Sequence, residues 1–194
     1  MRPIAILLLA AGASSRMAPR DKLLEHVAGE PLIALIARRA TLTRLPCYVT
    51  LPSLSHPRAS WIGTATAIPV PDAAEGMAAS IRAGIAALPN NIEAVMILPT
   101  DMPEIESQDL MHIAAHYQDI DGPILRACAT DGTPGHPVLF PRRYFGDLST
   151  LTGDTGARAV LTKAPVELIS LPGQRATTDL DTPEAWSRWR ALES

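Results

Sequence analysis

The chain has 194 residues, enough for one domain with a substantial hydrophobic core. A net charge of −3 and the lack of any lysine or arginine run argue against a nucleic acid as partner. No apolar stretch approaches the roughly 20 residues of a membrane-spanning helix, which argues against a membrane protein. A small anionic metabolite stays compatible with this composition, because a few well-placed cations suffice to bind one.

In the first half of the chain, strand-like and helix-like patterns alternate. The pattern predicts buried strands at 4–9, 46–51, 64–70 and 93–99, and helices at 31–42, 74–89 and 107–118. Ser107 is a candidate cap for the last of these helices. Apolar strands that alternate with helices are typical of a parallel sheet covered by helices on both faces.

The second half is richer in strands, which we predict at 122–128, 136–141 and 166–171, with a short helix at 154–163. Thr182, Pro183 and Glu184 provide a cap, a first-turn proline and a first-turn acid, so a final helix is predicted to begin there. We therefore expect a single α/β domain over 1–194. Its fold would be Rossmann-like with three layers, and its central sheet mainly parallel with a mixed edge.

The opening stretch, IAILLLAAGASSRM at 4–17, has two interpretations. It resembles a secretory signal in having one basic residue, Arg2, before a short apolar run and small residues. Alternatively it is a buried first strand that runs into a ligand-binding loop. We favour the strand, because the run AVMILP at 94–99 is a natural neighbour for it in a parallel sheet. The protein is then expected to be cytoplasmic.

Ligands of open α/β sheets bind at the carboxyl ends of the strands. Small residues after the first strand would let a phosphate approach backbone N–H groups, and hydroxyl and cationic side chains follow them. These residues are Ala10, Ala11, Gly12, Ser14, Ser15, Arg16 and Lys22. Their spacing fits neither G-x-G-x-x-G nor the P-loop, so a dehydrogenase or a P-loop NTPase is not supported.

Other chemistry-bearing residues have simpler interpretations. Cys47 and Cys128 lie far apart in apolar segments and are interpreted as reduced core thiols. His112 and His116 share a helix face with the spacing of two zinc ligands. However, Ile113 stands where a zinc protease has its glutamate, and no third ligand is evident, so we interpret this face as partly exposed.

Six motifs in order carry a family resemblance. They are LAAGASSRM followed by DKLL, AEGMAASIRAGI, LPTDMP, GTPGHPVLFP, GDTGARAVL and TDLDTPEAW. Together they resemble the molybdenum cofactor cytidylyltransferases of the MocA/MobA-like NTP transferase family, with the guanylyltransferases as relatives. The resemblance spans nearly the whole chain. It implies the nucleotidyltransferase fold and a cytoplasmic enzyme that uses Mg²⁺.

The resemblance implies that a phosphate on the acceptor attacks the α-phosphorus of CTP or GTP, and pyrophosphate leaves. The acceptor would be a molybdopterin-type cofactor, and a molybdoenzyme or its maturation chaperone would be a partner. Arg16, Lys22 and Asp101 would be catalytic, and Asp101 and Asp181 would hold the metal. Asp101 directly follows a strand and suits Mg²⁺, although an aspartate there is also a common turn residue, as Asp181 is a common helix-start residue.

The resemblance also assigns a binding role to two further groups. Leu9 would border the phosphate loop. Near the base would lie Gly76, Met77 and Ser80, and on the acceptor side Gly135, His136, Pro137 and Arg158. Asp179 is a further acid in the last motif. Each of the base-side and acceptor-side residues could instead have an ordinary role in packing or at the surface.

One departure from the family pattern concerns the phosphate loop. Ala18-Pro19-Arg20 stands where the family often has a glycine, so the loop must take a different path and gains a cation. Two rivals stay open at this stage. One is a nucleotidyltransferase with another base or another phosphorylated acceptor, and the other is a module that binds nucleotide or pterin without catalysis.

Overall fold

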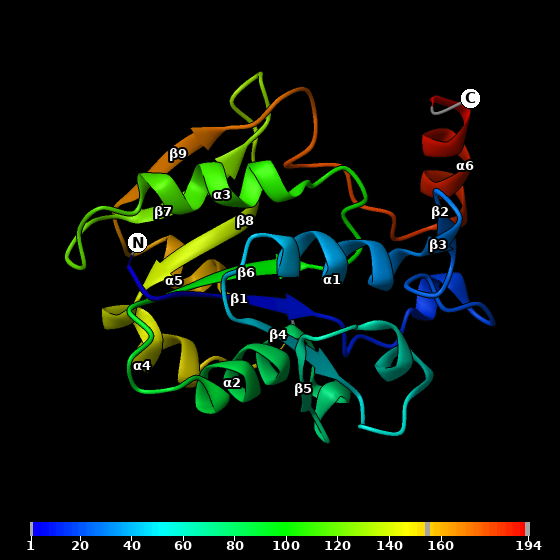
Figure 1. The fold of residues 1–194 in the computed structure, drawn as a ribbon, viewed down its shortest axis with the longest axis horizontal. Helices are drawn as coiled ribbons and strands as arrows, with labels where there is room; N and C mark the ends of the chain where they lie inside the picture. The colour runs from blue at the N-terminus through cyan, green and yellow to red at the C-terminus, as the bar shows by residue number, and fades with distance from the viewer. Residues whose placement is uncertain (1, 154–155, 193–194) are drawn as a thin grey trace.

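Strand β1 (Ile4–Leu9) lies inside the main sheet of the protein (Figure 1). The computed structural model describes residues 2–153 and 156–192. Within them the main sheet has seven strands, in the order β5, β4, β1, β6, β8, β7, β9. The other strands are β4 (Cys47–Leu51), β5 (Thr66–Pro69), β6 (Ala94–Pro99), β7 (Ile124–Cys128), β8 (Pro134–Pro141) and β9 (Val166–Ser170).

The sheet is parallel on one side and mixed on the other. β1 pairs in parallel with β4 and with β6, and β4 pairs in parallel with β5. β8 runs antiparallel to both β6 and β7, while β7 and β9 are parallel. The prediction of a mainly parallel sheet with a mixed edge is confirmed, as is the pairing of 4–9 with the AVMILP run.

Helices cover both faces of this sheet, giving three layers (Figure 1). On one face lie α1 (Leu32–Leu42), α3 (Ser107–His116) and α6 (Pro183–Leu192). On the other lie α2 (Met77–Ala87), α4 (Phe145–Ser149) and α5 (Arg158–Leu161). None of the helices among the described residues is both long and apolar enough to cross a bilayer.

Strand β1 supplies side chains to both of these layers. Ile4, Ile6 and Leu8 belong to the core under α1 and α3, and Leu7 belongs to the core under α2. All four are at most 1% exposed. Successive side chains of a strand point to opposite faces, so a strand buried on both faces must be apolar throughout. This explains why the opening run has no polar position.

Several boundaries differ from the sequence prediction. The capping residue of α3 is Glu106, not Ser107, because Glu106 and Asp109 form a reciprocal capping box. The Ser107 hydroxyl instead donates to the carbonyl of Arg39, at 2.8 Å. The helix predicted at 154–163 is shorter, with Arg158–Leu161 as its helical part and 154–155 outside the described residues.

Some elements were not predicted. They are the hairpin of β2 (His26–Val27) and β3 (Glu30–Pro31), helix α4, and the 3₁₀ turns η1 (Ser15–Met17), η2 (Pro57–Trp61), η3 (Ala73–Glu75) and η4 (Arg142–Tyr144). All of them are only two to five residues long, which is too short for a period to be recognised in the sequence.

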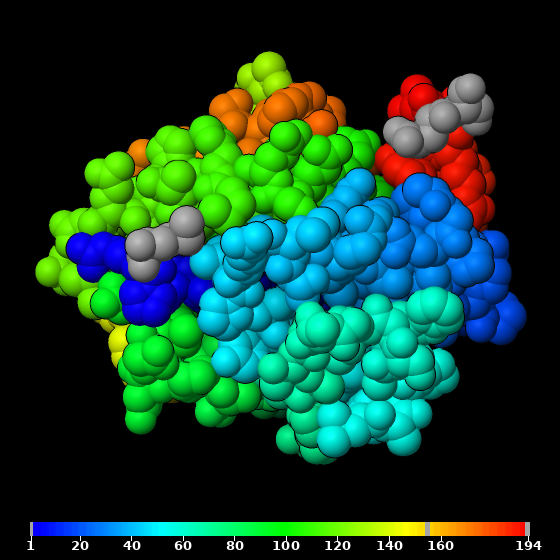
Figure 2. Space-filling model, viewed as in Figure 1, coloured from blue at the N-terminus to red at the C-terminus, as the bar shows by residue number. Residues whose placement is uncertain are grey.

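The C-terminal segment returns to the N-terminal part of the chain. The Thr182 hydroxyl accepts from the N–H of Ala185 at 3.2 Å, which confirms the predicted cap of α6. Arg190 donates to Glu25 at 3.1 Å, and Figure 2 shows the red C-terminal residues beside the blue early ones. Helix α6 therefore lies beside the residues that lead into the β2–β3 hairpin.

Helix α2 packs closely against β1 at Gly84, which predicts the effect of a larger residue there. A Cβ at Gly84 would lie 2.3 Å from Cδ2 of the fully buried Leu7, whereas one at Gly146 would meet nothing within 4 Å. We expect Gly84→Ala to lower the free energy of unfolding by about 1–2 kcal/mol, because overpacking outweighs the gain in helix propensity. Gly146→Ala, the matched control, leaves it unchanged or higher. Urea denaturation measures both, and a Gly84→Ala protein more stable than the parent would contradict the prediction.

Candidate active site

Two loops meet where β1 and β6 end. Leu9 and Pro99 are paired in the sheet, so the residues that follow them start side by side. The N–H and the hydroxyl of Thr100 both donate to the carbonyl of Leu9, at 3.3 and 2.9 Å. The loop after β1 and Asp101 after β6 are thereby held at the same edge of the sheet, as parallel strands require.

The loop after β1 presents a row of backbone donors. The N–H of Ala10 donates to the carbonyl of Thr50 at 3.1 Å, so it still belongs to the sheet and cannot serve a ligand as predicted. The N–H groups of residues 11–15, by contrast, donate to no acceptor within the described part of the chain. Successive N–H groups of this kind form an anion-binding concavity.

A buried arginine shapes this loop. Arg58, in η2, is 2% exposed, and its guanidinium contacts the loop at four residues. Nη1 donates to the carbonyls of Ala10 and Gly12 at 2.6 and 2.8 Å, and Nη2 donates to the hydroxyl of Ser14 at 3.0 Å. Nε and Nη2 form a fork on the carboxylate of Asp21, each at 2.7 Å.

These contacts orient the loop peptides. In a planar trans peptide the carbonyl and the next N–H point in opposite directions. Because the carbonyls of Ala10 and Gly12 point at Arg58, the N–H groups of Ala11 and Ala13 point away from it. Sequence reasoning missed Arg58, since the segment around it reads as an ordinary polar loop and carries no spacing signal.

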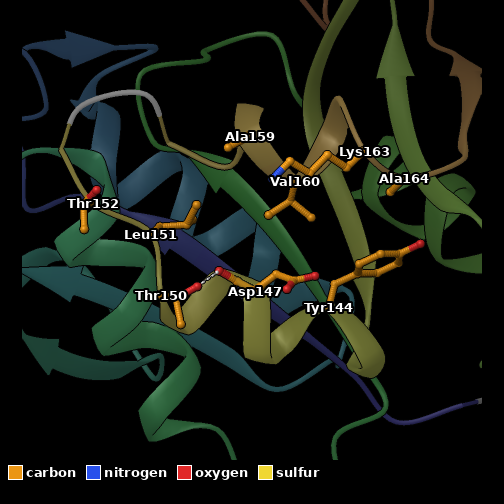
Figure 3. Close-up of a pocket in the computed structure, with 9 residues that line it drawn as sticks. All are labelled: Tyr144, Asp147, Thr150, Leu151, Thr152, Ala159, Val160, Lys163 and Ala164. Carbon is orange, nitrogen blue, oxygen red and sulfur yellow. Dashed lines mark hydrogen bonds between the residues drawn. The ribbon is translucent and has the colours of Figure 1, made fainter.

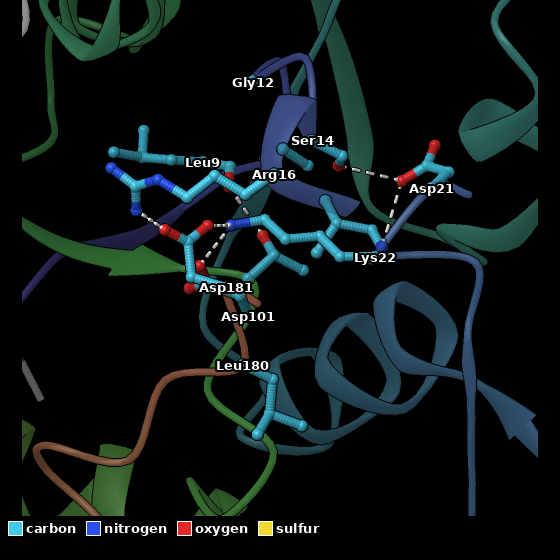
Figure 4. Close-up of polar contacts among 12 residues, drawn as sticks. Leu9, Gly12, Ser14, Arg16, Asp21, Lys22, Asp101, Leu180 and Asp181 are labelled. Atoms are coloured by element: carbon cyan, nitrogen blue, oxygen red, sulfur yellow. Dashed lines mark hydrogen bonds and ion pairs between the residues drawn. The ribbon is translucent and has the colours of Figure 1, made fainter. Parts of the chain in front are cut away.

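Lys22 joins the two sides of the site. Its Nζ donates to Oδ2 of Asp101 at 2.5 Å and to Oδ1 of Asp181 at 2.7 Å (Figure 4). Arg16 forms a second ion pair with Asp181. Asp181 reaches this point because the N–H of Leu180 donates to the carbonyl of Asp101 at 2.9 Å. The predicted convergence of the loop and the two acidic motifs is therefore present in the structure.

The electrostatics of the cluster follow from burial and charge. Burial alone would lower the pKa of Lys22, but Asp101 and Asp181 outweigh it and raise that pKa. Burial would likewise raise the pKa of Asp181, and the hydrogen bonds and charges of Lys22 and Arg16 lower it instead. Asp179 lacks such a partner, so burial and the charges of Asp101 and Asp181 raise its pKa. The cluster thus holds more negative charge than its cations balance.

Asp101 and Asp181 offer carboxylate oxygens to a divalent metal. Oδ1 of Asp101 is buried and has no hydrogen-bond partner, although its other oxygen is bound to Lys22. Among the described residues no group of three or more acidic, histidine or cysteine side chains is arranged as a metal cage. Mg²⁺ takes one or two carboxylates together with phosphate oxygens and water, so Asp101 and Asp181 fit such an ion.

The mixed edge of the sheet supplies the far wall. A Cβ at Gly135 would lie 1.8 Å from the carbonyl of Ala176, so only glycine allows this close approach. The N–H of His136 donates to the same carbonyl at 2.8 Å. Burial, followed by the charge of Arg126, lowers the pKa of His136 to about 4, and its buried Nδ1 has no partner. At neutral pH the imidazole is therefore uncharged.

Three adjoining cavities follow this edge. The first, of about 390 Å³, lies over residues 9–13. The second, of about 710 Å³, is here called the Asp101 cleft, since Lys22 and Asp101 line it as well as the first. The third, of about 440 Å³, is called the arginine cavity, because Arg126 and Arg158 line it. Met77 lines all three, so they lie side by side, and together they are here called the depression.

Most predicted site residues line these cavities. The first cavity collects Leu9, Ala10, Ala11, Gly76 and Ser80, and the Asp101 cleft collects Gly12, Ser14, Ser15, Arg16, Lys22, Met77, Asp101, Gly135, His136, Asp179 and Asp181. Arg158 lines the arginine cavity, and Pro137 is buried within β8 and lines none of the three. The acceptor segment predicted at 154–158 begins with two residues outside the described ones.

The remaining predicted residues lie elsewhere. The rings of His112 and His116 are both on the exposed side of α3, edge to face with centroids 4.7 Å apart. Cys47 and Cys128 are free and buried, and burial raises the pKa of the Cys47 thiol to about 12. Arg20 belongs to the segment Ala18-Pro19-Arg20, which differs from the family pattern. Its side chain forms a surface ion pair with Glu25 at 3.6 Å.

Family comparison agrees with this geometry. Residues 6–168 match the model of the MobA-like NTP transferase domain. The chain belongs to that family. It is therefore a nucleotidyltransferase domain. No curated protein matches the chain.

Solved structures share the fold over the full length. Rv0371c from Mycobacterium tuberculosis H37Rv has a TM-score of 0.84 and 24% identity, with 100% of this chain and 99% of that chain covered. The same protein in complex with manganese has a TM-score of 0.81 and 24% identity, covering 99% of each chain. Molybdopterin-guanine dinucleotide biosynthesis protein A from Archaeoglobus fulgidus has a TM-score of 0.73 and 15% identity, covering 97% of each.

The Arg58 contacts predict a large stability effect. Arg58→Met leaves the carboxylate of Asp21 half-buried without its partner, so we expect the free energy of unfolding to fall by about 3–5 kcal/mol. Arg58→Lys recovers little of it, because an ammonium cannot form the fork. As a control, Arg38→Met breaks an exposed pair with Glu30 and costs less than about 1 kcal/mol. Urea denaturation measures these changes. Equal losses of unfolding free energy in Arg58→Met and Arg38→Met would refute the stabilising role of the Arg58 contacts.

The same contact predicts a pH dependence. Burial raises the pKa of Asp21, but the hydrogen bonds and charge of Arg58 outweigh it, so the pKa in the folded state lies below the ordinary value. A lowered carboxyl pKa stabilises the fold above about pH 4 and the gain is lost as pH falls through the folded pKa. We expect the stability gap between the parent and Arg58→Met to be largest at pH 7 and to narrow towards pH 3. Asp21→Asn and the double variant Asp21→Asn/Arg58→Met have no carboxyl at position 21, so the difference between their free energies of unfolding should change little with pH. A difference between the parent and Arg58→Met that does not narrow towards pH 3 would count against the prediction.

Proposed function

We propose that this protein transfers a nucleoside monophosphate, CMP from CTP, to the terminal phosphate of a molybdopterin-type cofactor. One observation carries the proposal. Lys22 bridges Asp101 and Asp181 in a cleft that residues 12–15 also line, and the N–H groups of these four residues donate to no acceptor among the described residues. An anion-binding loop beside a cation and two carboxylates is what phosphoryl chemistry with a divalent ion requires.

The reaction needs charge to be neutralised and two anions to be aligned. A phosphate oxygen of the acceptor attacks the α-phosphorus of CTP, the bond to the β-phosphate oxygen breaks, and pyrophosphate leaves with the electron pair. The loop N–H groups would bind the phosphates of CTP, and Arg16 and Lys22 would offset their charge. Asp101 and Asp181 would hold Mg²⁺, which when bound neutralises phosphate oxygens. The manganese complex of Rv0371c agrees with a divalent ion at this fold.

The two ends of the depression would separate donor and acceptor. Gly76, Met77 and Ser80 line the first cavity and would frame the cytosine base. His136 and Arg158 line the arginine cavity and would face the acceptor. The uncharged imidazole suits this place, since it offers one donor and one acceptor and adds no charge.

The cellular setting is part of the proposal. Two free, buried thiols are common in a reducing compartment, which supports a cytoplasmic protein. A molybdoenzyme or its maturation chaperone would receive the dinucleotide product. The Archaeoglobus structure, named for molybdopterin-guanine dinucleotide biosynthesis, supports an acceptor of this class.

Substitution of Lys22 tests the proposal. With CTP, Mg²⁺ and molybdopterin, we expect the dinucleotide and pyrophosphate to form, and Lys22→Met to slow the transfer by about 10²–10³-fold, because one preorganised cation is lost. The matched control is Lys163→Met, an exposed lysine that lines none of the three cavities. Chelation of the metal should stop the reaction in the parent.

The product is followed by mass spectrometry and pyrophosphate by a coupled assay. Transfer at the parent rate by Lys22→Met would overturn the catalytic assignment. Faster transfer from GTP would replace the donor, and binding of CTP without any product would leave a non-catalytic module.

A further inference from the structure

An arginine on α2 grips the acid that precedes the helix. Glu75 ends η3, and Arg82 lies on α2. Nη1 and Nη2 of Arg82 donate to the two carboxylate oxygens of Glu75, at 2.7 and 2.6 Å. Two such parallel hydrogen bonds fix the relative position of a guanidinium and a carboxylate. The hydrogen bond from Arg82, followed by one from the N–H of Gly153, lowers the pKa of the Glu75 carboxyl, so this acid is ionised at neutral pH.

The same pair also holds residues 151–153, which follow α4. Nη1 of Arg82 donates to the carbonyl of Leu151 at 2.7 Å. Oε1 of Glu75 accepts from the N–H of Gly153 at 3.3 Å. The Glu75–Arg82 pair therefore joins three parts of the chain, namely η3, α2 and the segment 151–153.

Few other contacts fix the segment 151–153. Within the described residues its hydrogen bonds lead only to Glu75 and to α2. The segment also borders a cavity of about 300 Å³, which residues of α4 and α5 line as well (Figure 3). Thr150 and Thr152 are exposed, and of the segment itself Leu151 alone is buried. The Glu75–Arg82 pair is therefore the main polar anchor of this segment.

Met77 lies between these contacts. Glu75 precedes it in the chain, and the N–H of Ala78, the residue after it, donates to the carbonyl of Gly153 at 3.2 Å. A Cβ at Gly156 would lie 2.7 Å from Sδ of Met77, so the backbone that follows the segment packs directly on this side chain. Met77 is 38% exposed and lines all three cavities of the depression. The position of this shared wall thus depends on how the segment is held.

A methionine needs such support if it is to select a ligand. Its side chain has three rotatable bonds and adapts to irregular surroundings. Flexible, methionine-rich surfaces are used by proteins that bind several partners, because they repack around each one. Met77 distinguishes one base from another only while the backbone on both sides of it is fixed. Neither Glu75 nor Arg82 lines any of the three cavities, so both act on a ligand through Met77.

We propose that Glu75 and Arg82 are positioning residues, which hold Met77 beside the nucleotide base and thereby set the preference for one base over another. This inference rests on the proposed function, in which Met77 frames the base. It assigns base selectivity in part to an ion pair that does not touch the nucleotide.

The dissociation constants of CTP and GTP test the inference. They are measured for the full chain with Mg²⁺ by isothermal titration calorimetry. We expect the parent to bind CTP more tightly than GTP, and Arg82→Met to reduce this preference about 5- to 10-fold, because a loosened wall fits either base. Arg82→Lys should lie in between, since an ammonium keeps the charge but not the fork. Glu75→Gln, which removes the charge at nearly constant size, should also reduce the preference.

The matched control is Arg38→Met, which breaks an exposed pair with Glu30 and should keep the preference of the parent. A purely stabilising role of Arg82 gives a different result. Partial unfolding removes binding of CTP and GTP alike, so the ratio of their dissociation constants stays at the parent value. Parent preference in both Arg82→Met and Glu75→Gln would overturn the inference.

Amide hydrogen exchange gives a second readout that needs no nucleotide. In Arg82→Met the N–H groups of Gly153 and Ala78 should exchange about 10-fold faster, because the segment opens locally. The N–H of Leu7, in the middle of the sheet, should keep its rate. An unchanged rate at Gly153 would show that the pair does not hold the segment, and would overturn the inference.

Failure of this inference and failure of the proposed function give different results. If CMP is transferred but Arg82→Met and Glu75→Gln keep the preference of the parent, the positioning role is wrong and the function stands. If Arg82→Met loses the preference and no acceptor yields a dinucleotide, the function is wrong and the positioning role stands.

Discussion

The fork of Arg58 on Asp21 is the contact on which the candidate site depends. A guanidinium 2% exposed is costly without partners, so the fold is stable only when the loop closes around it. That closure fixes both ends of the loop at once. The carbonyls of Ala10 and Gly12 turn inward, which leaves the N–H groups of Ala11 and Ala13 for a ligand. It also fixes Asp21, and the next residue, Lys22, then extends to the carboxylates on the other side.

A second constraint brings the end of the chain to the same place. Lys22 and Asp181 are 159 positions apart, and their contact depends on how the segment before α6 is held. The N–H of Leu180 donates to the carbonyl of Asp101, and the indole of Trp186 donates to the carbonyl of Leu180. Trp186 is 2% exposed, so burial of α6 and placement of Asp181 are one event. The same packing that completes the core therefore completes the charge cluster.

The sequence was sufficient to predict the buried strands, because their apolar residues form continuous runs. The apolar runs at 4–9 and 94–99 predicted parallel neighbours, and both lie buried in that arrangement, since a strand covered on two faces has no polar positions. The sequence was not sufficient for Arg58, whose role is decided by partners that the fold brings close. Sequence reasoning also counted the N–H of Ala10 among the donors of the loop. In the structure this N–H donates to the carbonyl of Thr50, because the neighbouring strand decides where a strand ends.

The arginines show how donor counting separates a structural role from a binding role. Arg58 directs all three of its nitrogens to oxygen atoms of the chain, so it has little capacity left for a ligand. Arg126 donates to the carbonyls of Gly135 and Pro134, and the side chain of Arg158 makes no hydrogen bond or ion pair within the described residues. The same type of side chain thus uses every donor to stabilise the loop in one place and keeps side-chain donors uncommitted in another. Charge that the fold does not neutralise is the feature that distinguishes a binding surface from a core contact.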